Sequence, residues 1–183
     1  MSTPFYTRGG DDGYTGLLGE GRVAKNDVRM EALGAVDEAG SAIGVARALT
    51  RTESAPPVLI QIQRDLYGLM GELAASPENA ARFRTIDAAR VTWLESLIDA
   101  LSSTVKAPKE FIVPGDTVAG AFFDVARTTV RRAERRVAAL YHAGGFENQD
   151  LLRYLNRLSS LLFLLELTEN LAAGNSRITL AKE

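Results

Sequence analysis

The residues most suited to chemistry lie on one predicted helix between residues 117 and 143. Spacings of four and three residues place Arg127, Arg131 and Glu134 on a single helical face, so two guanidinium groups and a carboxylate project the same way. Three further arginines surround this face: Arg132, Arg135 and Arg136. The planar guanidinium fork binds phosphate or carboxylate through two hydrogen bonds. Five arginines and no lysine within ten residues therefore indicate a local anion site.

A solvated helix face is the ordinary alternative, in which Arg131 and Glu134 form an exposed pair that contributes about 0.3–0.5 kcal/mol. Asp37 favours the functional interpretation. It falls on the predicted apolar stripe of the first helix, between Leu33 and Gly44, where an unpaired carboxylate would cost several kcal/mol. The sequence therefore predicts a cationic partner for Asp37, and Arg127 is a candidate.

The amino-terminal run TRGGDDGYTG, residues 7–16, has the composition of a loop that surrounds a polyphosphate. Glycines free the backbone amides to approach an anion, Thr7 and Thr15 supply hydroxyls, and Arg8 supplies a cation. Lys25, in the run GRVAKND, is a further cation within reach. We therefore expect this segment to bind phosphate.

Two features of this loop limit that prediction. Asp11 and Asp12 would repel a triphosphate unless Mg²⁺ or a nearby arginine offsets their charge. The segment is not a Walker A sequence, because no GK[ST] follows the glycines. A flexible glycine-rich tail remains the alternative.

Asn156 and His142 pose smaller questions. Asn156 lies one step from Leu155 on a leucine-rich surface, where a buried amide must find partners, so a core asparagine and a ligand contact both remain open. His142 falls in the last turn of its predicted helix, where a cation favours the helix dipole, and we interpret it as structural. A single histidine also excludes a ferritin-like di-metal bundle, which needs two Glu-x-x-His motifs.

Five helical segments must position these residues. Caps, prolines and glycines predict where these helices begin and end. The first is capped by Asp27 and reaches about residue 48, the second runs from Pro56 and Pro57 to Pro77, and the third is capped by Asp87 and ends before Pro108. The fourth is capped by Thr117 or Asp116 and reaches about Ala143, and the fifth starts near Asn148. We find no convincing strand. The predicted core faces are Met30, Leu33, Val36, Gly40, Ile43 and Gly44 on the first helix and Phe122, Val125, Ala126, Ala133, Val137 and Leu140 on the fourth, with leucines around much of the fifth.

These segments predict an all-α, five-helix bundle: a four-helix-bundle-like core plus one additional helix. We expect a single domain over residues 1–183, with a glycine-rich, extended nucleotide-binding loop at 1–26, the bundle at 27–173 and a tail at 174–183. The net charge of −2 offers no field for nucleic acid or an anionic membrane, and the absence of cysteine excludes disulfides and thiolate metal sites. No apolar run approaches the roughly 18 residues of a membrane span, so we expect a cytoplasmic protein with no metal site built from its own side chains.

Six fragments carry a resemblance to a known family. In order along the chain they are TRGGDDGYTG, GRVAKND, EALGAVDE, FIVPGDT, VARTTVRRAERR and NRLSSLLF. Their order and spacing are similar to those of the PduO-type cobalamin adenosyltransferases, and the resemblance spans the whole chain. The arginine-rich fragment is the most specific of the six.

The resemblance implies an enzyme that transfers the 5′-deoxyadenosyl group of ATP to cobalt(I) of cobalamin or a related corrinoid and releases triphosphate. It implies a homotrimer, with ATP at each subunit interface between the amino-terminal loop of one chain and the fourth helix of its neighbour, with Mg²⁺ on the phosphates and with electrons from a flavin-dependent reductase. Two alternatives keep the same fold: a non-catalytic ATP-binding trimer with a regulatory or corrinoid-chaperone role, and a purely structural helical oligomer.

Site residues follow from the resemblance by matching motif. The expected nucleotide-loop residues are Thr7, Arg8, Gly9, Gly10, Thr15, Gly16 and Lys25, and the expected helix-borne nucleotide contacts are Arg131, Arg132, Glu134, Arg135 and Asn156. Asp37 and Arg127 resemble the inter-subunit ion pair of the family. Phe111 matches the aromatic that displaces the lower axial ligand of the corrinoid, leaving four-coordinate cobalt(II) that is easier to reduce. Arg131, Glu134 and Phe111 are the expected catalytic residues.

Two positions depart from the family pattern. The family commonly shows PGG where this chain has Pro114, Gly115 and Asp116, and an acidic residue where this chain has Ser160. The first departure alters the loop beside Phe111 and the second a polar contact near Asn156. We therefore expect both to bear on which corrinoid fits.

Overall fold

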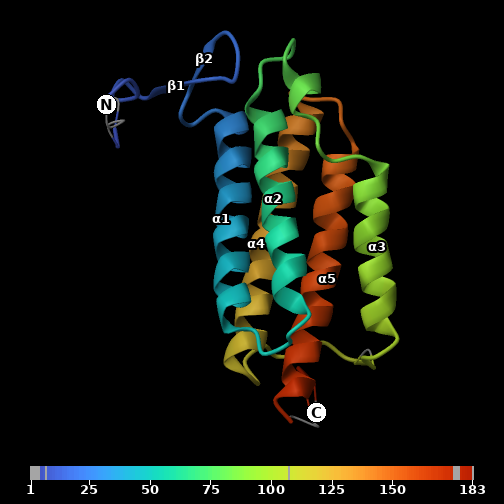
Figure 1. Ribbon diagram of the computed structural model, residues 1–183. Helices are drawn as coiled ribbons and strands as arrows, with labels where there is room; N and C mark the ends of the chain where they lie inside the picture. The colour runs from blue at the N-terminus through green and yellow to red at the C-terminus, as the bar shows by residue number, and fades with distance from the viewer. Residues whose placement is uncertain (1–4, 7, 107, 175–177, 183) are drawn as a thin grey trace.

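Five α-helices form an elongated bundle in the computed structural model, which describes residues 5–6, 8–106, 108–174 and 178–182 (Figure 1). The helices are α1 (Val28–Leu49), α2 (Ala55–Ala74), α3 (Ala88–Ser102), α4 (Val118–His142) and α5 (Asp150–Ala172), with a short 3-10 helix, η1, at Ala80–Phe83. Helices α1, α2, α4 and α5 surround the common core, and α3 packs against the outer side of α5. The predicted five-helix bundle is confirmed.

The helix starts are fixed by the residues that the sequence suggested. The Asp27 side chain accepts a hydrogen bond from Arg29 N at 2.8 Å, and the Asp87 side chain accepts one from Arg90 N at 2.9 Å. Thr117 caps α4 by accepting from Gly120 N at 2.9 Å, which decides between the two predicted caps. These side chains satisfy backbone amides that have no partner within the first helical turn.

The predicted core faces of α1 and α4 are confirmed in part. Val36 and Ile43 on α1, and Ala126, Ala133, Val137 and Leu140 on α4, are buried as predicted, whereas other positions differ. The buried face of α1 consists mainly of alanines, at positions 32, 35, 39 and 46, together with Val36 and Ile43. On α4, Phe123 and Val130 are buried, whereas the predicted core residue Val125 is 48% exposed. Small alanines let α1 and α4 pack closely, but they carry too weak a hydrophobic signal to mark the buried stripe.

A short antiparallel hairpin precedes the bundle. Strand β1 (Tyr14–Gly16) pairs with β2 (Arg22–Ala24), so the prediction of no strand is wrong here. Three-residue strands are too short for an alternating pattern to be recognised. The hairpin turn is tied to the end of α2, where Leu18 N donates to Ala74 O at 2.9 Å and Ser76 N donates to Leu18 O at 3.2 Å.

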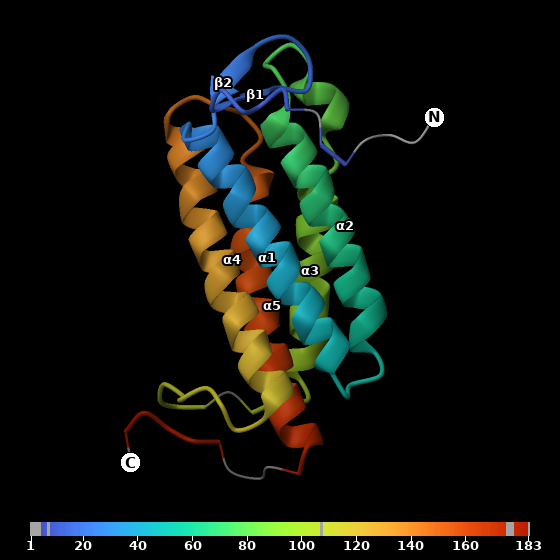
Figure 2. The same cartoon turned by 90° about the vertical axis from the view of Figure 1, so that its left-hand side faces the viewer.

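The two ends of the bundle carry different segments. The hairpin lies at the end where α1 starts and α4 finishes, and Arg29 donates there to Gly145 O at 2.9 Å (Figure 2). The loop between α3 and α4 and the carboxyl-terminal residues lie together at the opposite end. Helix α4, with 25 residues, spans about 37 Å between them at about 1.5 Å per residue. Among the described residues, no helix is both long and apolar enough to cross a membrane.

Buried polar groups fix α5 against its neighbours. Tyr154 donates from its hydroxyl to Asp65 Oδ2 at 2.6 Å, and Arg90 pairs with the same carboxylate, which joins α2, α3 and α5. Burial, followed by the charge of Asp65, raises the pKa of Tyr154, so its hydroxyl stays a donor. Farther along α5, Glu169 accepts from Thr50 Oγ1 and from the backbone amides of Arg51 and Thr52. Helix α5 is therefore a fixed wall for whatever packs against its other side.

Candidate active site

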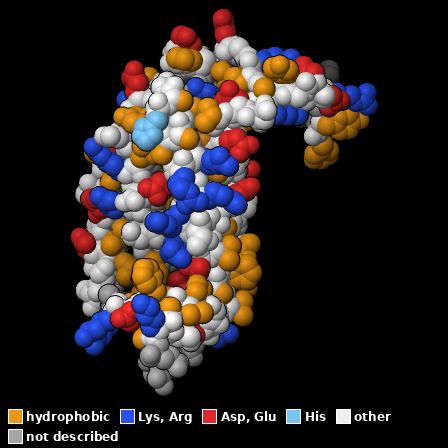
Figure 3. Space-filling model, turned by 180° about the vertical axis from the view of Figure 1, so that it is seen from behind, with side chains coloured by type: hydrophobic (Ala, Val, Ile, Leu, Met, Phe, Trp, Pro, Cys, Tyr) orange, Lys and Arg blue, Asp and Glu red, His pale blue; other side chains and the backbone are white. Residues whose placement is uncertain are grey.

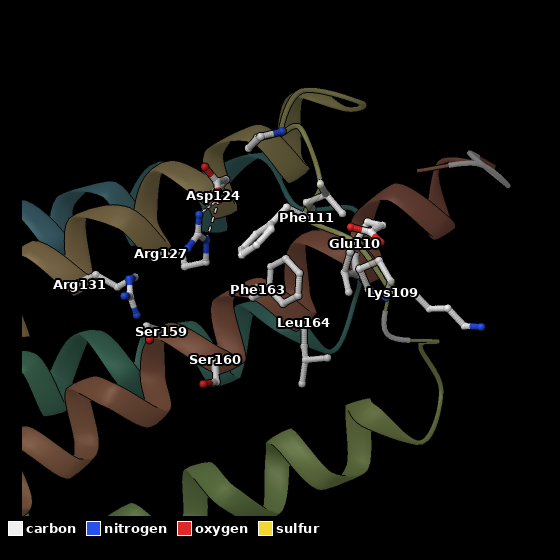
Figure 4. Close-up of a pocket in the computed structure, with 14 residues that line it drawn as sticks. Lys109, Glu110, Phe111, Asp124, Arg127, Arg131, Ser159, Ser160, Phe163 and Leu164 are labelled. Carbon is white, nitrogen blue, oxygen red and sulfur yellow. Dashed lines mark hydrogen bonds and ion pairs between the residues drawn. The ribbon is translucent and has the colours of Figure 1, made fainter. Parts of the chain in front are cut away.

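A cavity of about 700 Å³ opens between α4, α5 and the loop that precedes α4 (Figure 4). Its lining residues are Pro108, Lys109, Glu110, Phe111, Ile112, Pro114, Asp124, Arg127, Arg131, Ser159, Ser160, Phe163, Leu164 and Leu167. The loop and α5 supply most of its apolar surface, α4 supplies Asp124, Arg127 and Arg131, and the loop adds Lys109 and Glu110. Such a cavity, mostly apolar with a few polar groups on one wall, is typical of a small-molecule site.

Phe111 stands at the mouth of this cavity. Its ring is 87% exposed and points toward the space between α4 and α5, on the side of Phe163, whereas Lys109 extends away from the cavity. An exposed phenylalanine ring beside an apolar wall is costly to hydrate and available to cover an apolar ligand. The structure thus places an exposed aromatic ring at the mouth of an apolar cavity.

Arg127 and Arg131 project from α4 into the same cavity (Figure 4). Arg127 donates from Nε to Asp124 Oδ1 at 2.7 Å, one turn earlier on the helix, so its guanidinium is held in place. Arg131 is exposed, and its backbone carbonyl accepts from Arg135 at 3.1 Å. The cavity wall therefore offers one guanidinium held by an acid and a second that faces solvent.

Glu134 and Asn156 are brought together across α4 and α5. Asn156 donates from Nδ2 to Glu134 Oε1 at 3.0 Å, and its carbonyl oxygen accepts from Arg157 at 2.8 Å. Asn156 is exposed, so the buried core asparagine considered above is ruled out. The sequence-predicted Arg131, Glu134 and Asn156 thus lie on one continuous surface.

Two further arginines of α4, Arg132 and Arg136, turn toward α1. Arg132 pairs with Glu38, and Arg136 lies 3.8 Å from Glu31. In a space-filling view, basic side chains gather midway along this face of the bundle, with acidic side chains interspersed among them (Figure 3). Arg132 is therefore engaged within the chain, and Arg131 faces the cavity.

Glu166 lies in the core of α5 behind this region. It is fully buried, and neither carboxylate oxygen has a hydrogen-bond partner among the described residues. Burial, with a smaller contribution from the charge of Asp124, raises its pKa to about 7, although Arg127 opposes the rise. The Phe111 end of the bundle thus contains a buried acid that titrates near neutral pH.

The amino-terminal loop is organised by a charge pair that the sequence only partly indicated. Arg22 bonds both oxygens of Asp12, each at 2.9 Å, and also donates to Gly9 O at 2.9 Å. The Asp12 side chain in turn accepts from Tyr14 N at 3.1 Å. Arg22 holds the pKa of Asp12 below its ordinary value. Either Mg²⁺ or a nearby arginine was expected to offset the negative charge of Asp12. Arg22 of the same chain is such an arginine.

The predicted nucleotide-loop residues cluster around this pair. Arg8 has a positive φ of 59° and stacks its guanidinium 5.3 Å from the Tyr6 ring centroid. The Lys25 side chain packs closely over Gly10, where a Cβ atom would lie 3.0 Å from Lys25 Nζ. Thr15 and Gly16 lie in β1, and Thr7 lies outside the described residues.

Asp37 does not occupy the buried position that the sequence suggested. It is exposed on α1, because the buried stripe of that helix consists of its alanines. Within the chain, Arg127 bonds Asp124 instead. The prediction of a buried carboxylate at position 37 is therefore wrong, and a pair between Asp37 and Arg127 of two different subunits stays a prediction.

Two elements of the site were not predicted. Asp124 lies three residues before Arg127, a spacing that helical geometry could have identified as a pair. The carboxyl-terminal residues, predicted as a tail, contact the Phe111 loop: Ile112 and Leu180 form an antiparallel bridge. The β-branched residues Ile178 and Thr179 were the available signal for this short extended segment.

The helical bundle therefore carries an apolar cavity beside a row of guanidinium groups, which is the kind of surface that suits a small-molecule site with an anionic part. Comparison with known proteins identifies the family of this chain. The cobalamin adenosyltransferase family model matches residues 5–169. The chain belongs to this family, and its relatives include PduO-type members.

Curated relatives agree along most of the chain. It is 41% identical over 173 residues to the corrinoid adenosyltransferase of Mycobacterium tuberculosis, covering 92% of this chain and 89% of that protein. It is 38% identical over 173 residues to the corrinoid adenosyltransferase of Bacillus subtilis, covering 92% and 88%. The match to the corrinoid adenosyltransferase PduO of Salmonella typhimurium, at 36% identity, covers 94% of this chain and 52% of the Salmonella protein.

A solved structure has the same fold. A variant of the PduO-type ATP:corrinoid adenosyltransferase from Lactobacillus reuteri, complexed with cobalamin and ATP, aligns with a TM-score of 0.89 and 33% sequence identity. The alignment covers 98% of this chain and 97% of that one. At this identity and coverage, the likeness extends from the fold to the family.

Proposed function

We propose that this chain is a corrinoid adenosyltransferase whose corrinoid substrate occupies the cavity beneath Phe111 and whose ATP lies against the arginine face of α4. One observation carries the proposal: Phe111, Arg127 and Arg131 line a single cavity. The large, flat corrinoid needs an apolar surface, and the triphosphate needs guanidinium groups. The cavity supplies both within one enclosure.

The amino-terminal loop contacts ATP from a second subunit. Within one chain, this loop lies at the opposite end of the bundle from the Phe111 cavity (Figure 2). Arg131 sits near the middle of α4, so Lys25 of the same chain, which precedes α1, is separated from the cavity by about half the length of the bundle. A neighbouring copy, placed with its hairpin over the arginine face, completes the site.

A homotrimer with three such interfaces fits this arrangement, because head-to-tail contacts that close on themselves form a ring. Val118 and Val125 on α4 are 67% and 48% exposed, and Val45 and Leu49 on α1 are 43% and 39% exposed. Scattered exposed apolar side chains are ordinary, but these four lie on α4, which carries the arginine face, and on the adjacent α1, where a partner would cover them. Asp37 is exposed on α1 and available for the predicted pair with a neighbouring Arg127.

The chemistry follows from positioning and charge. Cobalt(I) of the reduced corrinoid attacks C5′ of ATP, the cobalt–carbon bond forms, and the C5′–oxygen bond breaks. The electron pair of that bond leaves with triphosphate. Arg131 stabilises the charge that develops on the leaving group, Glu134 orients Asn156 toward the nucleotide, and Phe111 excludes an axial ligand from the corrinoid.

Mg²⁺ accompanies ATP in this proposal. Magnesium sites commonly combine substrate phosphates with one or two carboxylates. Asp11 lies in the glycine-rich loop beside the paired Asp12 and is the nearest candidate ligand from that segment. A flavin-dependent reductase as the source of electrons, and a cytoplasmic location, stay predictions from the sequence.

The test is turnover by the full chain. Incubation with ATP, Mg²⁺ and chemically reduced cobalamin should change the visible absorbance as the cobalt–carbon bond forms, with triphosphate released in equal amount. Arg131→Ala should abolish the change, and Arg153→Ala, which removes an exposed arginine paired with Asp150 outside the cavity, should leave it intact. Bound ATP without any spectral change in the unaltered protein would contradict the proposal and favour a non-catalytic role.

A further inference from the structure

The carboxyl-terminal segment 178–182 pairs with the loop that carries Phe111. Val113 N donates to Thr179 O at 2.9 Å, and Ala181 N donates to Phe111 O at 2.7 Å. Between these bonds, Ile112 and Leu180 form an antiparallel bridge. Both segments lie at the same end of the bundle (Figure 2). The loop over the cavity is therefore held by main-chain hydrogen bonds to residues more than 60 positions away in the sequence.

Asp116 adds a side-chain clamp to this pairing. Its Oδ1 accepts from Thr179 Oγ1 at 2.7 Å, and its Oδ2 accepts from Thr179 N at 3.0 Å. Both oxygens of one carboxylate thus bind a single residue of the tail, and hydrogen bonds to an ionised acceptor are stronger than neutral ones. Gly115, with a φ of 128°, makes the turn that presents Asp116 to the tail.

Packing alone does little to fix the Phe111 loop. Phe111 is 87% exposed and Val113 is 45% exposed, so neither side chain anchors the loop in the core. The carbonyl of Phe111 itself accepts the bond from Ala181, which sets the backbone from which the ring projects. Fixing a loop residue otherwise costs conformational entropy when a ligand binds, and pre-organisation removes that cost.

We infer that Asp116 and Thr179 are a positioning pair that holds the Phe111 ring over the cavity, and that they tune the fit of the corrinoid without touching it. This rests on the proposed assignment of the cavity to the corrinoid. It also accounts for the departure at position 116: the carboxylate that replaces the second glycine of the family pattern is the group that holds Thr179. The carboxyl-terminal segment 178–182 thus holds the Phe111 loop on the side away from the core.

The test separates the two substrates in the full-length protein. Thr179→Val keeps the size of the side chain and the backbone amide but removes the hydroxyl donor, and Asp116→Ala removes both acceptors. The KM for reduced cobalamin should rise about tenfold, the size expected for the loss of one hydrogen bond to a charged acceptor, while the KM for ATP stays within about twofold. Thr179→Ser, which restores the hydroxyl, should return the KM for cobalamin toward its original value.

A spectroscopic signature reports positioning directly. With cob(II)alamin and ATP bound, the share of four-coordinate cobalt in the absorbance spectrum should fall in Thr179→Val, because a displaced ring no longer excludes the axial ligand. Thr92→Val is the matched control, since Thr92 is an exposed threonine whose hydroxyl bonds Ala88 O within its own helix. It should leave both the KM for cobalamin and the spectrum unchanged.

Phe111→Ala distinguishes failure of this inference from failure of the site assignment. A raised KM for cobalamin in Phe111→Ala, with no change in Thr179→Val and Asp116→Ala, overturns the inference and leaves the cavity assignment standing. Equal rises in the KM for ATP and for cobalamin would show the clamp to be structural and also overturn it. An unchanged KM for cobalamin in all three variants overturns the assignment of the cavity and the inference with it.

Discussion

The hairpin end and the Phe111 end of this molecule are the two proposed ligand sites, and they are stabilised by different interactions. At the hairpin end, glycines bring the backbone close, Asp12 and Arg22 form an exposed charge pair, and the turn is tied to α2 through Leu18. At the Phe111 end, the walls are helices packed on a common core, and the carboxyl-terminal segment of the same chain holds the loop. The first suits a phosphate chain and the second a broad apolar ring.

This difference bears on assembly. The two ends are separated by α4, which spans about 37 Å, yet adenosyl transfer requires the nucleotide and the cobalt to come into contact. In the proposed site, a single chain supplies one half of each of two sites, and a neighbouring copy brings its hairpin to the arginine face. The separation of the two ends within the chain supports this proposal of catalysis between chains.

The strongest test of this comparison combines two inactive variants. Arg131→Ala removes the cavity-side cation and Lys25→Ala removes the loop-side cation, and each alone should lower kcat by at least about 100-fold, as loss of a charge-stabilising donor does. When equal amounts of the two are unfolded and refolded together, about a quarter of the interfaces in a random trimer would pair an intact loop with an intact α4. Activity should return to about that fraction, measured by cobalamin absorbance.

The control for this experiment mixes each variant with itself, and neither mixture should recover activity. A double variant that carries both changes in one chain should also fail to complement either single variant beyond background. If the mixture of the two single variants stays inactive while hybrid oligomers are present by mass spectrometry, both cations act from the same chain, and the comparison of the two ends is wrong.

The pH dependence of stability distinguishes the two ends, because a carboxylate is paired at the surface at one end and buried without a hydrogen-bond partner among the described residues at the other. Asp12 is paired at the surface, whereas Glu166 is buried with its pKa raised from 4.5 to about 7. As the pH rises above about 4.5, Glu166 ionises in the unfolded state but stays protonated in the folded state. The unfolded state is thereby favoured, and stability is lost until the pH reaches about 7. The free energy of unfolding should fall by up to about 3 kcal/mol across this window.

Glu166→Gln removes this titration and keeps the shape of the side chain. The variant should therefore match the unaltered protein near pH 4.5 and exceed its stability at pH 8, measured by urea unfolding at one protein concentration. Glu147→Gln, a change at an exposed acid near the start of α5, should follow the unaltered protein across the range. Parallel curves for Glu166→Gln and the unaltered protein would show that Glu166 is ionised in the folded state.

Phe111→Ala tests the cavity end by itself. Loss of an aromatic surface that is exposed in the free protein should weaken corrinoid binding about tenfold and leave ATP binding unchanged, since the ring contributes nothing to the core. Titration of cobalamin followed by absorbance, with and without ATP, separates the two affinities. A loss of ATP affinity in this variant would mean that the ring belongs to the nucleotide site.

The sequence was informative where a local rule decides the structure. Asp27, Asp87 and Thr117 cap their helices as predicted, and the spacing of Arg131 and Glu134 placed them correctly on one face. The alanine-rich buried face of α1 was misplaced, because the hydrophobic pattern of the sequence does not distinguish a surface alanine from a core alanine. The error at Asp37 followed directly from that misplaced stripe.

Long-range pairing explains the rest of what was missed. The bond from Ala181 to Phe111 joins positions 70 residues apart, and no periodicity along the chain encodes such a contact. Asn156 meets Glu134 because α4 and α5 pack at a particular register, which sequence spacing within one helix cannot supply. The family resemblance predicts roles for Phe111, Glu134 and Asn156, and the structure shows the contacts that these residues make within the chain.

The smallest expected effect lies at the hairpin end. Arg22→Ala leaves Asp12 uncompensated beside the glycines and releases the carbonyl of Gly9, so the loop should lose order and repel triphosphate. Because the pair is exposed, the KM for ATP should rise only about threefold to fivefold, with no change in the KM for cobalamin. Arg22→Ala combined with Asp12→Asn should recover most of the loss, since the repelling charge is gone. Arg64→Ala, at an exposed arginine on α2, is the matched control. A rise in the KM for cobalamin in Arg22→Ala would mean that the two ends of the bundle do not divide the substrates between them.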